Sequence, residues 1–112
     1  MGTLHDLTIY KKAIQLVSKI YLLIEVNNKL KNDFSLCDQI KRASISVACN
    51  ISEGYYRSSR QSKNYYHIAS ASANEVITLL EIINNVYAIN IGEIREEYQY
   101  LAKQINSFCS SF

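Results

Sequence analysis

The chain has 112 residues, of which 48% are hydrophobic and 20% are charged, and its formal net charge is +2. This composition excludes an intrinsically disordered chain, and the length predicts one globular domain over residues 1–112. The chain has no proline and only three glycines, which argues against a β-sandwich or barrel with many tight turns. No apolar stretch is long enough to cross a membrane and the first residues do not form a secretory signal, so we expect a cytoplasmic protein.

Apolar residues recur at alternating steps of three and four residues in four segments of the chain. This spacing keeps one face of a helix buried, whereas a strand would need a period of two. It predicts helices over residues 6–27, 35–56, 60–88 and 93–110. Because the mean step is about 3.5 residues and the links are short, the fold expected is all-α, an antiparallel up-down four-helix bundle with left-handed packing.

Each predicted helix has one core-facing stripe. On the helix over 6–27 the stripe runs through Tyr10, Ile14, Val17, Tyr21 and Ile24. On the next three helices it runs through Leu36, Ile40, Ala43, Val47, Asn50 and Gly54; through Tyr66, Ala69, Ala73, Val76, Leu80, Ile83 and Tyr87; and through Ile91, Ile94, Tyr98, Leu101, Ile105, Phe108 and Phe112.

Polar residues mark the starts of the later helices. Ser35 with Asp38 predicts a capping box, and Ser58 or Ser59 predicts an N-cap. Glu93, Glu96 and Glu97 stand near the positive end of the last helix.

Several apolar residues lie away from these stripes. They are Ile9, Leu16, Leu23, Ile45, Ile68, Leu79, Ile82 and Val86. Two interpretations are open: a wide buried face on the central helices, or burial against other copies of the chain. We favour the second, because a bundle this small has few places to bury them, and the first seven are the predicted oligomer interface.

Catalytic and metal-binding patterns are scarce. Cys37, Cys49 and Cys109 are odd in number and widely spaced, which fits buried thiols better than a disulfide framework. His67 has no histidine or cysteine three or four residues away with which to bind a metal. No nucleophile or phosphate-loop motif is present, so we expect neither an enzyme nor a cofactor.

Glu53 and Glu75 are the carboxylates of a segment otherwise free of acids. One interpretation leaves each one solvated or paired with a nearby cation. The other makes them an acid/base pair, but the sequence supplies no nucleophile or metal to work with them.

Positive charge gathers around the second predicted turn. Residues 1–74 carry ten Lys or Arg against five Asp or Glu, whereas residues 75–112 carry two against five. The cluster consists of Arg57, Arg60 and Lys63, with Lys41 and Arg42 on the helix that leads into the turn. Tyr55, Tyr56, Tyr65 and Tyr66 lie among them, although Tyr66 falls on the core stripe. Cations bind phosphates and aromatic rings stack on unpaired bases, so the cluster indicates nucleic-acid contact; an ordinary solvated basic surface is the alternative.

The stretch from Gln39 to Gly54, followed by Arg57 and the stretch from Tyr65 to Glu75, resembles the four-helix-bundle proteins encoded by intervening sequences in bacterial 23S ribosomal RNA genes. The most specific parts are Asn50, Glu53 and Gly54, and the Ala-x-x-Ser-x-x-Glu of Ala69, Ser72 and Glu75. The chain departs from the family's common pattern in having Tyr10 for Trp, Ala71 for Gly, and no proline in the first loop.

The resemblance implies an up-down bundle that assembles into a five-membered ring. It also implies nucleic-acid binding, and structural roles for Asn50, Glu53, Gly54 and Glu75, with Glu53 and Glu75 sharing a structural pairing with Arg57 or Arg42. A related, more basic branch serves as accessory protein to the reverse transcriptase of diversity-generating retroelements. We therefore expect a non-catalytic, oligomeric RNA- or DNA-binding protein; the alternative is an accessory module that docks a larger partner such as a reverse transcriptase.

Overall fold

Helices form nearly all of the structure. It is a computed structural model, and it describes residues 2–112 except for the side chain of Asp6. The elements are the 3-10 helix η1 (Leu4–Asp6) and the α-helices α1 (Thr8–Glu25), α2 (Asn28–Lys31), α3 (Phe34–Tyr55), α4 (Ser59–Tyr87) and α5 (Gly92–Cys109). Within this range there is no strand. The all-α prediction is therefore confirmed, and the four long helices begin and end within two residues of the expected positions.

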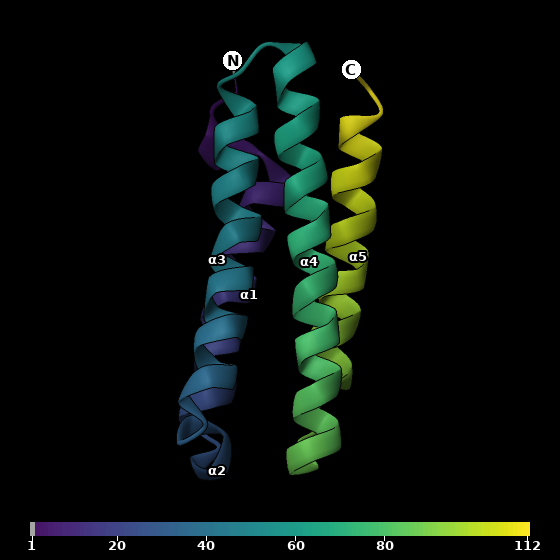
Figure 1. The fold of residues 1–112 in the computed structure, drawn as a ribbon. Helices are drawn as coiled ribbons and strands as arrows, with labels where there is room; N and C mark the ends of the chain where they lie inside the picture. The colour runs from purple at the N-terminus through teal and green to yellow at the C-terminus, as the bar shows by residue number, and fades with distance from the viewer. Residues whose placement is uncertain (1) are drawn as a thin grey trace.

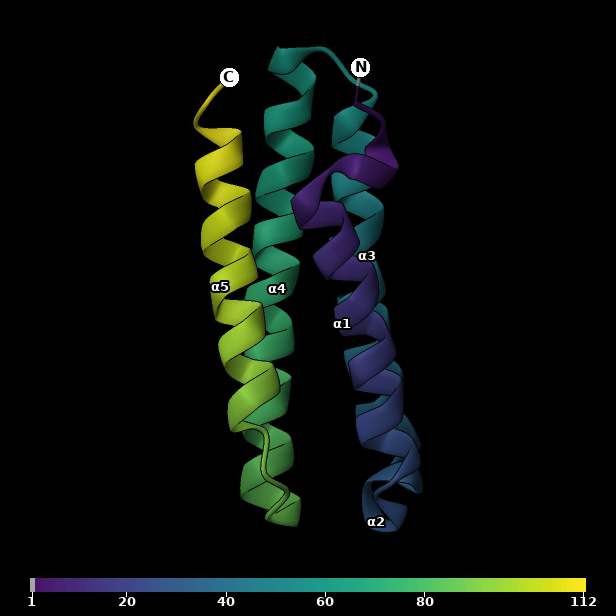
Figure 2. The same ribbon diagram turned by 180° about the vertical axis from the view of Figure 1, so that it is seen from behind.

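The long helices lie side by side, and each packs against two others. α1 contacts α3 and α5, and α4 contacts the same two helices from the other side. Successive long helices run in opposite directions (Figure 1). The molecule is elongated, with extents of 44 × 22 × 20 Å. Both termini and the α3–α4 turn lie at one end, whereas α2 and the α4–α5 link lie at the other (Figures 1 and 2).

The helix ends follow from local side chains. Asp33, and not the expected Ser35 with Asp38, is the N-cap of α3, where its carboxylate accepts from the backbone N–H of Leu36 at 3.2 Å. Ser58 is the N-cap of α4, as one of the two alternatives had it. α4 ends at Ala88, which adopts a left-handed φ of 56°.

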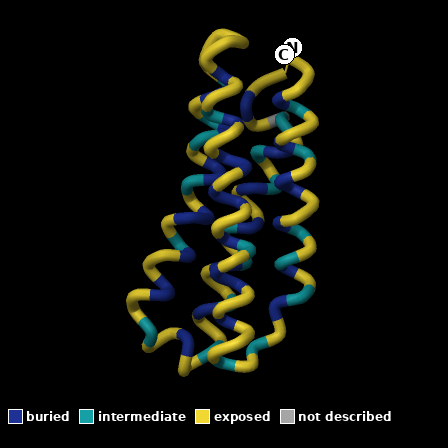
Figure 3. The backbone as a smooth tube through the Cα atoms, turned by 45° about the vertical axis from the view of Figure 1, so that its right-hand side comes forward, coloured by how far each residue is buried: buried dark blue, intermediate teal, exposed yellow. Residues whose placement is uncertain are grey.

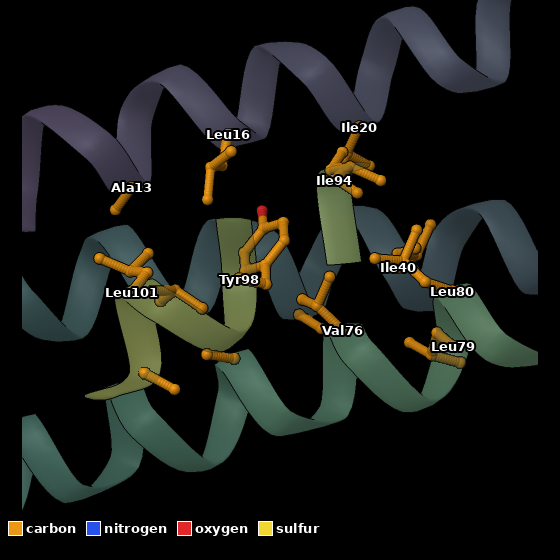
Figure 4. Close-up of a cluster of buried hydrophobic side chains, with 14 of the residues drawn as sticks. Ala13, Leu16, Ile20, Ile40, Val76, Leu79, Leu80, Ile94, Tyr98 and Leu101 are labelled. Carbon is orange, nitrogen blue, oxygen red and sulfur yellow. The ribbon is translucent and has the colours of Figure 1, made fainter. Parts of the chain in front are cut away.

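Buried residues lie on the inward side of every long helix, while the α3–α4 turn is exposed (Figure 3). The stripes predicted for α3, α4 and α5 are buried, apart from Asn50, Tyr87 and Phe108, which are half-buried, and Phe112, which is exposed. Side chains from α1, α3, α4 and α5 meet in the core around Tyr98 and Val76 (Figure 4).

The predicted stripe of α1 is wrong for most of its residues. Of the five only Ile24 is buried, Tyr10 and Val17 are half-buried, and Ile14 and Tyr21 are 45% and 42% exposed. The buried residues of α1 are Ile9, Ala13, Leu16, Ile20 and Ile24. Both stripes have steps of three and four, so spacing alone does not choose between them. Which stripe is buried depends on where α3 and α5 lie, because these helices cover the side of α1 that carries Leu16.

This correction changes the predicted oligomer surface. Ile9, Leu16 and Leu79 are buried within the single chain and are not available to another copy. Leu23 is half-buried, whereas Ile45, Ile68 and Ile82 are about two-fifths exposed. Among the described helices, none is long and apolar enough to cross a membrane.

Candidate nucleic-acid interface

The turn between α3 and α4 is short because the two helices approach each other closely. A Cβ atom on the buried Gly54 would lie 3.0 Å from Cζ of Tyr66, so only glycine fits this close contact without displacement. The chain then turns through Tyr56 and Arg57, whose backbone N–H donates to the carbonyl of Gly54 at 3.2 Å. Ser58 begins α4 directly afterwards.

Three of the five predicted cations, Arg57, Arg60 and Lys63, lie at this turn. The Arg57 guanidinium donates to Glu53 at 2.9 Å and lies over the ring of Tyr65, 5.5 Å from its centroid. The hydrogen bond to Glu53 raises the pKa of Arg57 further above its usual value. Arg60 and Lys63 are exposed, and no carboxylate of the described residues pairs with either. The turn therefore carries two cations that no acid neutralises.

The structure does not bring Lys41 and Arg42 to the turn. They lie on α3 more than a dozen residues before its end, which places them about 20 Å away along the helix axis. The Lys41 ammonium lies 4.8 Å from the ring centroid of Tyr21 on α1. The Arg42 guanidinium pairs with Asp38 one turn earlier at 2.9 Å. Both have local roles, so the candidate site is smaller than the predicted five-residue cluster.

The tyrosines near the turn divide into two groups. Tyr66 is 1% exposed, packs edge-on against Phe108 and stacks on Phe112, and its burial raises the pKa of its hydroxyl to about 12. It belongs to the core, as its position on the stripe predicted. Tyr56, in contrast, is 71% exposed. Tyr55 and Tyr65 are half-buried, and the ring of Tyr55 meets that of Tyr56 edge-on.

A hollow of about 390 Å³ lies beside Arg57 and is lined by Arg57, Gln61, Asn64 and Tyr65. The sequence reasoning singled out the cation and the ring but missed the two amides. Part of the signal was present, because Gln61 and Asn64 are three residues apart, which places them on one side of α4, and Arg57 lies in the turn just before that helix. Lys63 faces another side, toward α5, where it lines a different hollow with His67 and Cys109.

The residues of the sequence motif join α3 to α4. The Asn50 amide donates to the carbonyl of Ser46 at 2.9 Å and to its hydroxyl at 3.0 Å. That hydroxyl lies 2.8 Å from the hydroxyl of Ser72 on α4. Ser46 had not been singled out, and it is the link between two motif residues on different helices. Polar groups at a helix contact fix the register of the two helices.

Glu53 and Glu75 do not form a pair. Since Ser46 lies opposite Ser72, Glu75 lies about ten residues, or about 15 Å, along the helices from the level of Glu53. Glu53 pairs with Arg57, one of the two partners that the family resemblance implied, and Glu75 is exposed. The separation argues against the acid/base interpretation.

The cysteines occupy three different environments. The Cys37 thiol donates to the carbonyl of Leu30 at 3.0 Å, and burial raises its pKa. Cys49 is exposed. Cys109 is buried with its sulfur 3.9 Å from Nε2 of His67. Within the described part of the chain, no three His, Cys, Asp or Glu side chains gather in a way that could hold a metal ion.

Comparison with known proteins places these features in context. Residues 5–109 match the family model described as 23S rRNA-intervening sequence protein. A solved structure of a protein with unknown function from the S23 ribosomal protein family of Bacteroides thetaiotaomicron is similar, with a TM-score of 0.73 and 26% sequence identity. The similarity covers 93% of this chain and 96% of that one. No curated protein matches the chain.

Proposed function

The chain belongs to the 23S rRNA-intervening sequence protein family, and from this premise we propose that it is a non-catalytic, oligomeric protein that binds nucleic acid through the α3–α4 turn. The observation that carries the proposal is the charge at this turn. Arg60 and Lys63, in the first turns of α4, have no acidic partner among the described residues, although Lys63 faces α5. Arg57, in the turn itself, pairs with a single carboxylate, that of Glu53. Unneutralised cations at one end of an elongated molecule attract phosphates.

The experiment that tests this proposal is the salt dependence of binding to a short structured RNA. Arg57→Ala with Arg60→Ala should weaken binding across sequences and reduce the salt slope by about one unit per lost phosphate contact. Lys29→Ala with Lys31→Ala is the matched control, because it removes the same charge at the opposite end of the molecule. If the two double variants weaken binding equally, the turn is not the binding site.

We also propose the finer architecture that the sequence pattern predicts, a left-handed four-helix bundle assembling into a ring. Support comes from the order of contacts, in which α1 and α4 each pack against α3 and α5, and from the exposed Ile45, Ile68 and Ile82. The five-membered ring is the assembly that the family resemblance implies.

A second candidate function is the docking of a larger partner protein, such as a reverse transcriptase, with little nucleic-acid contact. A hollow of about 380 Å³ between α1 and α5 favours it. The apolar residues that line it include Leu22 and Val26, which are 60% and 67% exposed. This function predicts a specific co-purifying protein that is lost in Leu22→Glu, and no retention of the chain on heparin at moderate salt.

A further inference from the structure

The hollow beside Arg57 has the size and the chemistry of a ligand site. Its volume of about 390 Å³ lies in the range of small-ligand pockets, roughly 300–1,000 Å³. One side is formed by the Tyr65 ring with the Arg57 guanidinium over it, 5.5 Å from the ring centroid. Gln61 and Asn64 complete the lining. The lining therefore combines an aromatic ring and a guanidinium, on which a flat ligand can stack, with two residues whose side-chain amides can form hydrogen bonds.

The two amides are free to bind. Within residues 2–112 neither side chain has a hydrogen-bond partner; the one bond recorded at Gln61 is made by its backbone N–H, which donates to the Ser58 hydroxyl. An amide offers a donor and an acceptor side by side, the combination that the edge of every nucleobase can meet. Both groups can rotate to suit the base, so the site would distinguish bases only weakly.

We propose that this hollow receives one unpaired base of a single-stranded nucleic acid. The base stacks against the Arg57–Tyr65 pair and bonds through its edge to Gln61 or Asn64. This inference rests on the proposed function and adds to it the class of strand that is bound. Phosphates of the same strand then reach Arg60, the second residue of α4.

A second ring supports a single strand over a duplex. Tyr56 adjoins Arg57 in the chain and is 71% exposed, far more than the buried tyrosines of this protein. An exposed aromatic ring beside cations is a stacking platform for a neighbouring base. In an RNA double helix the bases are stacked on one another, their Watson–Crick edges are paired, and the major groove is too deep and narrow for side chains to read. The ring would therefore find no free base face and the amides no accessible Watson–Crick edge.

The decisive experiment compares an intact and an abasic single strand of equal charge, with a duplex as a third ligand. Fluorescence anisotropy would give the Kd of the wild-type chain for a single-stranded RNA of about ten nucleotides, for an abasic strand of the same length, and for a blunt duplex. We expect the abasic strand to bind at least about fivefold more weakly than the intact one. Equal Kd values for the intact and abasic strands would overturn the inference while leaving the proposed function standing. Failure of all three ligands to bind would overturn the proposed function itself.

Variants locate the base. Tyr65→Leu, and Gln61→Ala with Asn64→Ala, should raise the Kd for the intact strand and leave the Kd for the abasic strand unchanged. Tyr65→Phe keeps the ring and should retain wild-type affinity, and Tyr100→Leu removes a ring that is 62% exposed on α5 as the matched control. The salt slope should not change in these variants, because no phosphate contact is lost. An equal loss of affinity for both strands would show a structural effect and would contradict the assignment.

Discussion

Gly54 shows how one residue sets the geometry of the candidate site. It is buried against the ring of Tyr66 and the Cβ of Tyr65, where an added Cβ would lie at 3.0–3.2 Å from these atoms. The Tyr66 ring is packed in the core, so it cannot give way cheaply. The absence of a side chain therefore allows α3 to approach α4 at the point where Arg57 leaves the helix.

Gly54→Ala should accordingly lower the free energy of unfolding by about 1–3 kcal/mol, the usual effect of overpacking. Chemical denaturation measures this. Gly92→Ala is the control, because its Cβ would meet only the Asn90 side chain, at an ordinary 3.5 Å. A variant Gly54→Ala as stable as Gly92→Ala would show that the contact is loose.

Tyr98 carries the clearest unsatisfied polar atom of the core. It is fully buried, and within the described residues its hydroxyl has no hydrogen-bond partner. Figure 4 shows the hydroxyl pointing toward the helix that carries Leu16. Burial raises the pKa of Tyr98. The Ser44 hydroxyl lowers this pKa to a smaller extent, although its own proton is donated to the carbonyl of Lys41.

Tyr98→Phe removes this atom and keeps the ring. We expect the free energy of unfolding to stay the same or to rise by up to about 1 kcal/mol, since no hydrogen bond is lost. Equilibrium denaturation of the two proteins would decide. A loss of more than about 1 kcal/mol would mean that the hydroxyl has a partner in solution, such as a buried water.

At the residue scale, the sequence predicted the contacts of residues whose partners lie nearby in the chain. The Glu53–Arg57 ion pair is an i, i+4 contact, and Tyr66 lies on a regular stripe. It did not predict Ser46, because the partner of that hydroxyl, Ser72, lies on another helix. The side of α1 that is buried also depends on distant helices, and that prediction failed.

At the scale of elements, Glu97 holds α1 to α5. Its carboxylate accepts from the Lys19 ammonium at 2.7 and 2.9 Å and from the Lys12 ammonium at 3.0 Å. The hydrogen bond to Lys19, more than any other contact, lowers the pKa of Glu97 below its ordinary value of 4.5. α1 and α5 share fewer contacts than the α3–α4 or α4–α5 pairs, so this cluster lies where the packing is thinnest.

The lowered pKa sets the direction of the pH dependence. A carboxyl group with a lowered pKa in the folded state stabilises the fold above its unfolded pKa, and this contribution is lost as the pH falls through the folded value. Glu97→Gln should therefore cost about 1 kcal/mol near neutral pH. Its stability should converge with that of the wild type as the pH falls from about 4.5 downward.

Denaturation curves from about pH 7 to about pH 3 measure this convergence. Glu96→Gln is the control, since it changes the same charge at an exposed neighbour that forms no ion pair with the described residues. If Glu96→Gln and Glu97→Gln lose equal stability, the effect is one of net charge and not of the Lys12–Glu97–Lys19 cluster.

The lengths of the elements were well predicted, because long amphipathic helices carry a strong periodic signal. The short helix α2 was missed, since its four residues are too few to show a period. The cap of α3 was also misplaced. The Asp33 carboxylate bonds both the Leu36 N–H and, at 2.6 Å, the hydroxyl of Tyr87, and that second contact is invisible from local sequence.

At the scale of the whole molecule, exposed aliphatic residues remain on α3 and α4. Ile45 and Ile68 lie on these adjoining helices, and each is 40% exposed. If copies of the chain pack through this face, Ile45→Glu with Ile68→Glu should convert an oligomer into a monomer, because buried charges without partners are costly.

Light scattering on a sizing column measures the mass against the 12.8 kDa of one chain. Leu22→Glu, a change at an exposed leucine on α1, should leave the oligomer intact. A wild-type chain that elutes as a monomer would contradict the assembly outright. A double variant that keeps the oligomeric mass would place the interface on another face.

Both chain termini lie at the same end of the molecule as the candidate site, and this affects how binding can be measured. Both termini lie at the end that carries the α3–α4 turn, and α2 lies at the far end of a body 44 Å long (Figure 2). A purification tag at either terminus would stand at the end that carries Arg57 and Arg60, where an acidic tag would compete with a nucleic acid for these cations. Immobilisation through such a tag would turn the same end toward the sensor surface and hide it. A single attachment point on α2, such as Lys29→Cys in a chain freed of its own exposed thiol at Cys49, would leave the turn facing the solution.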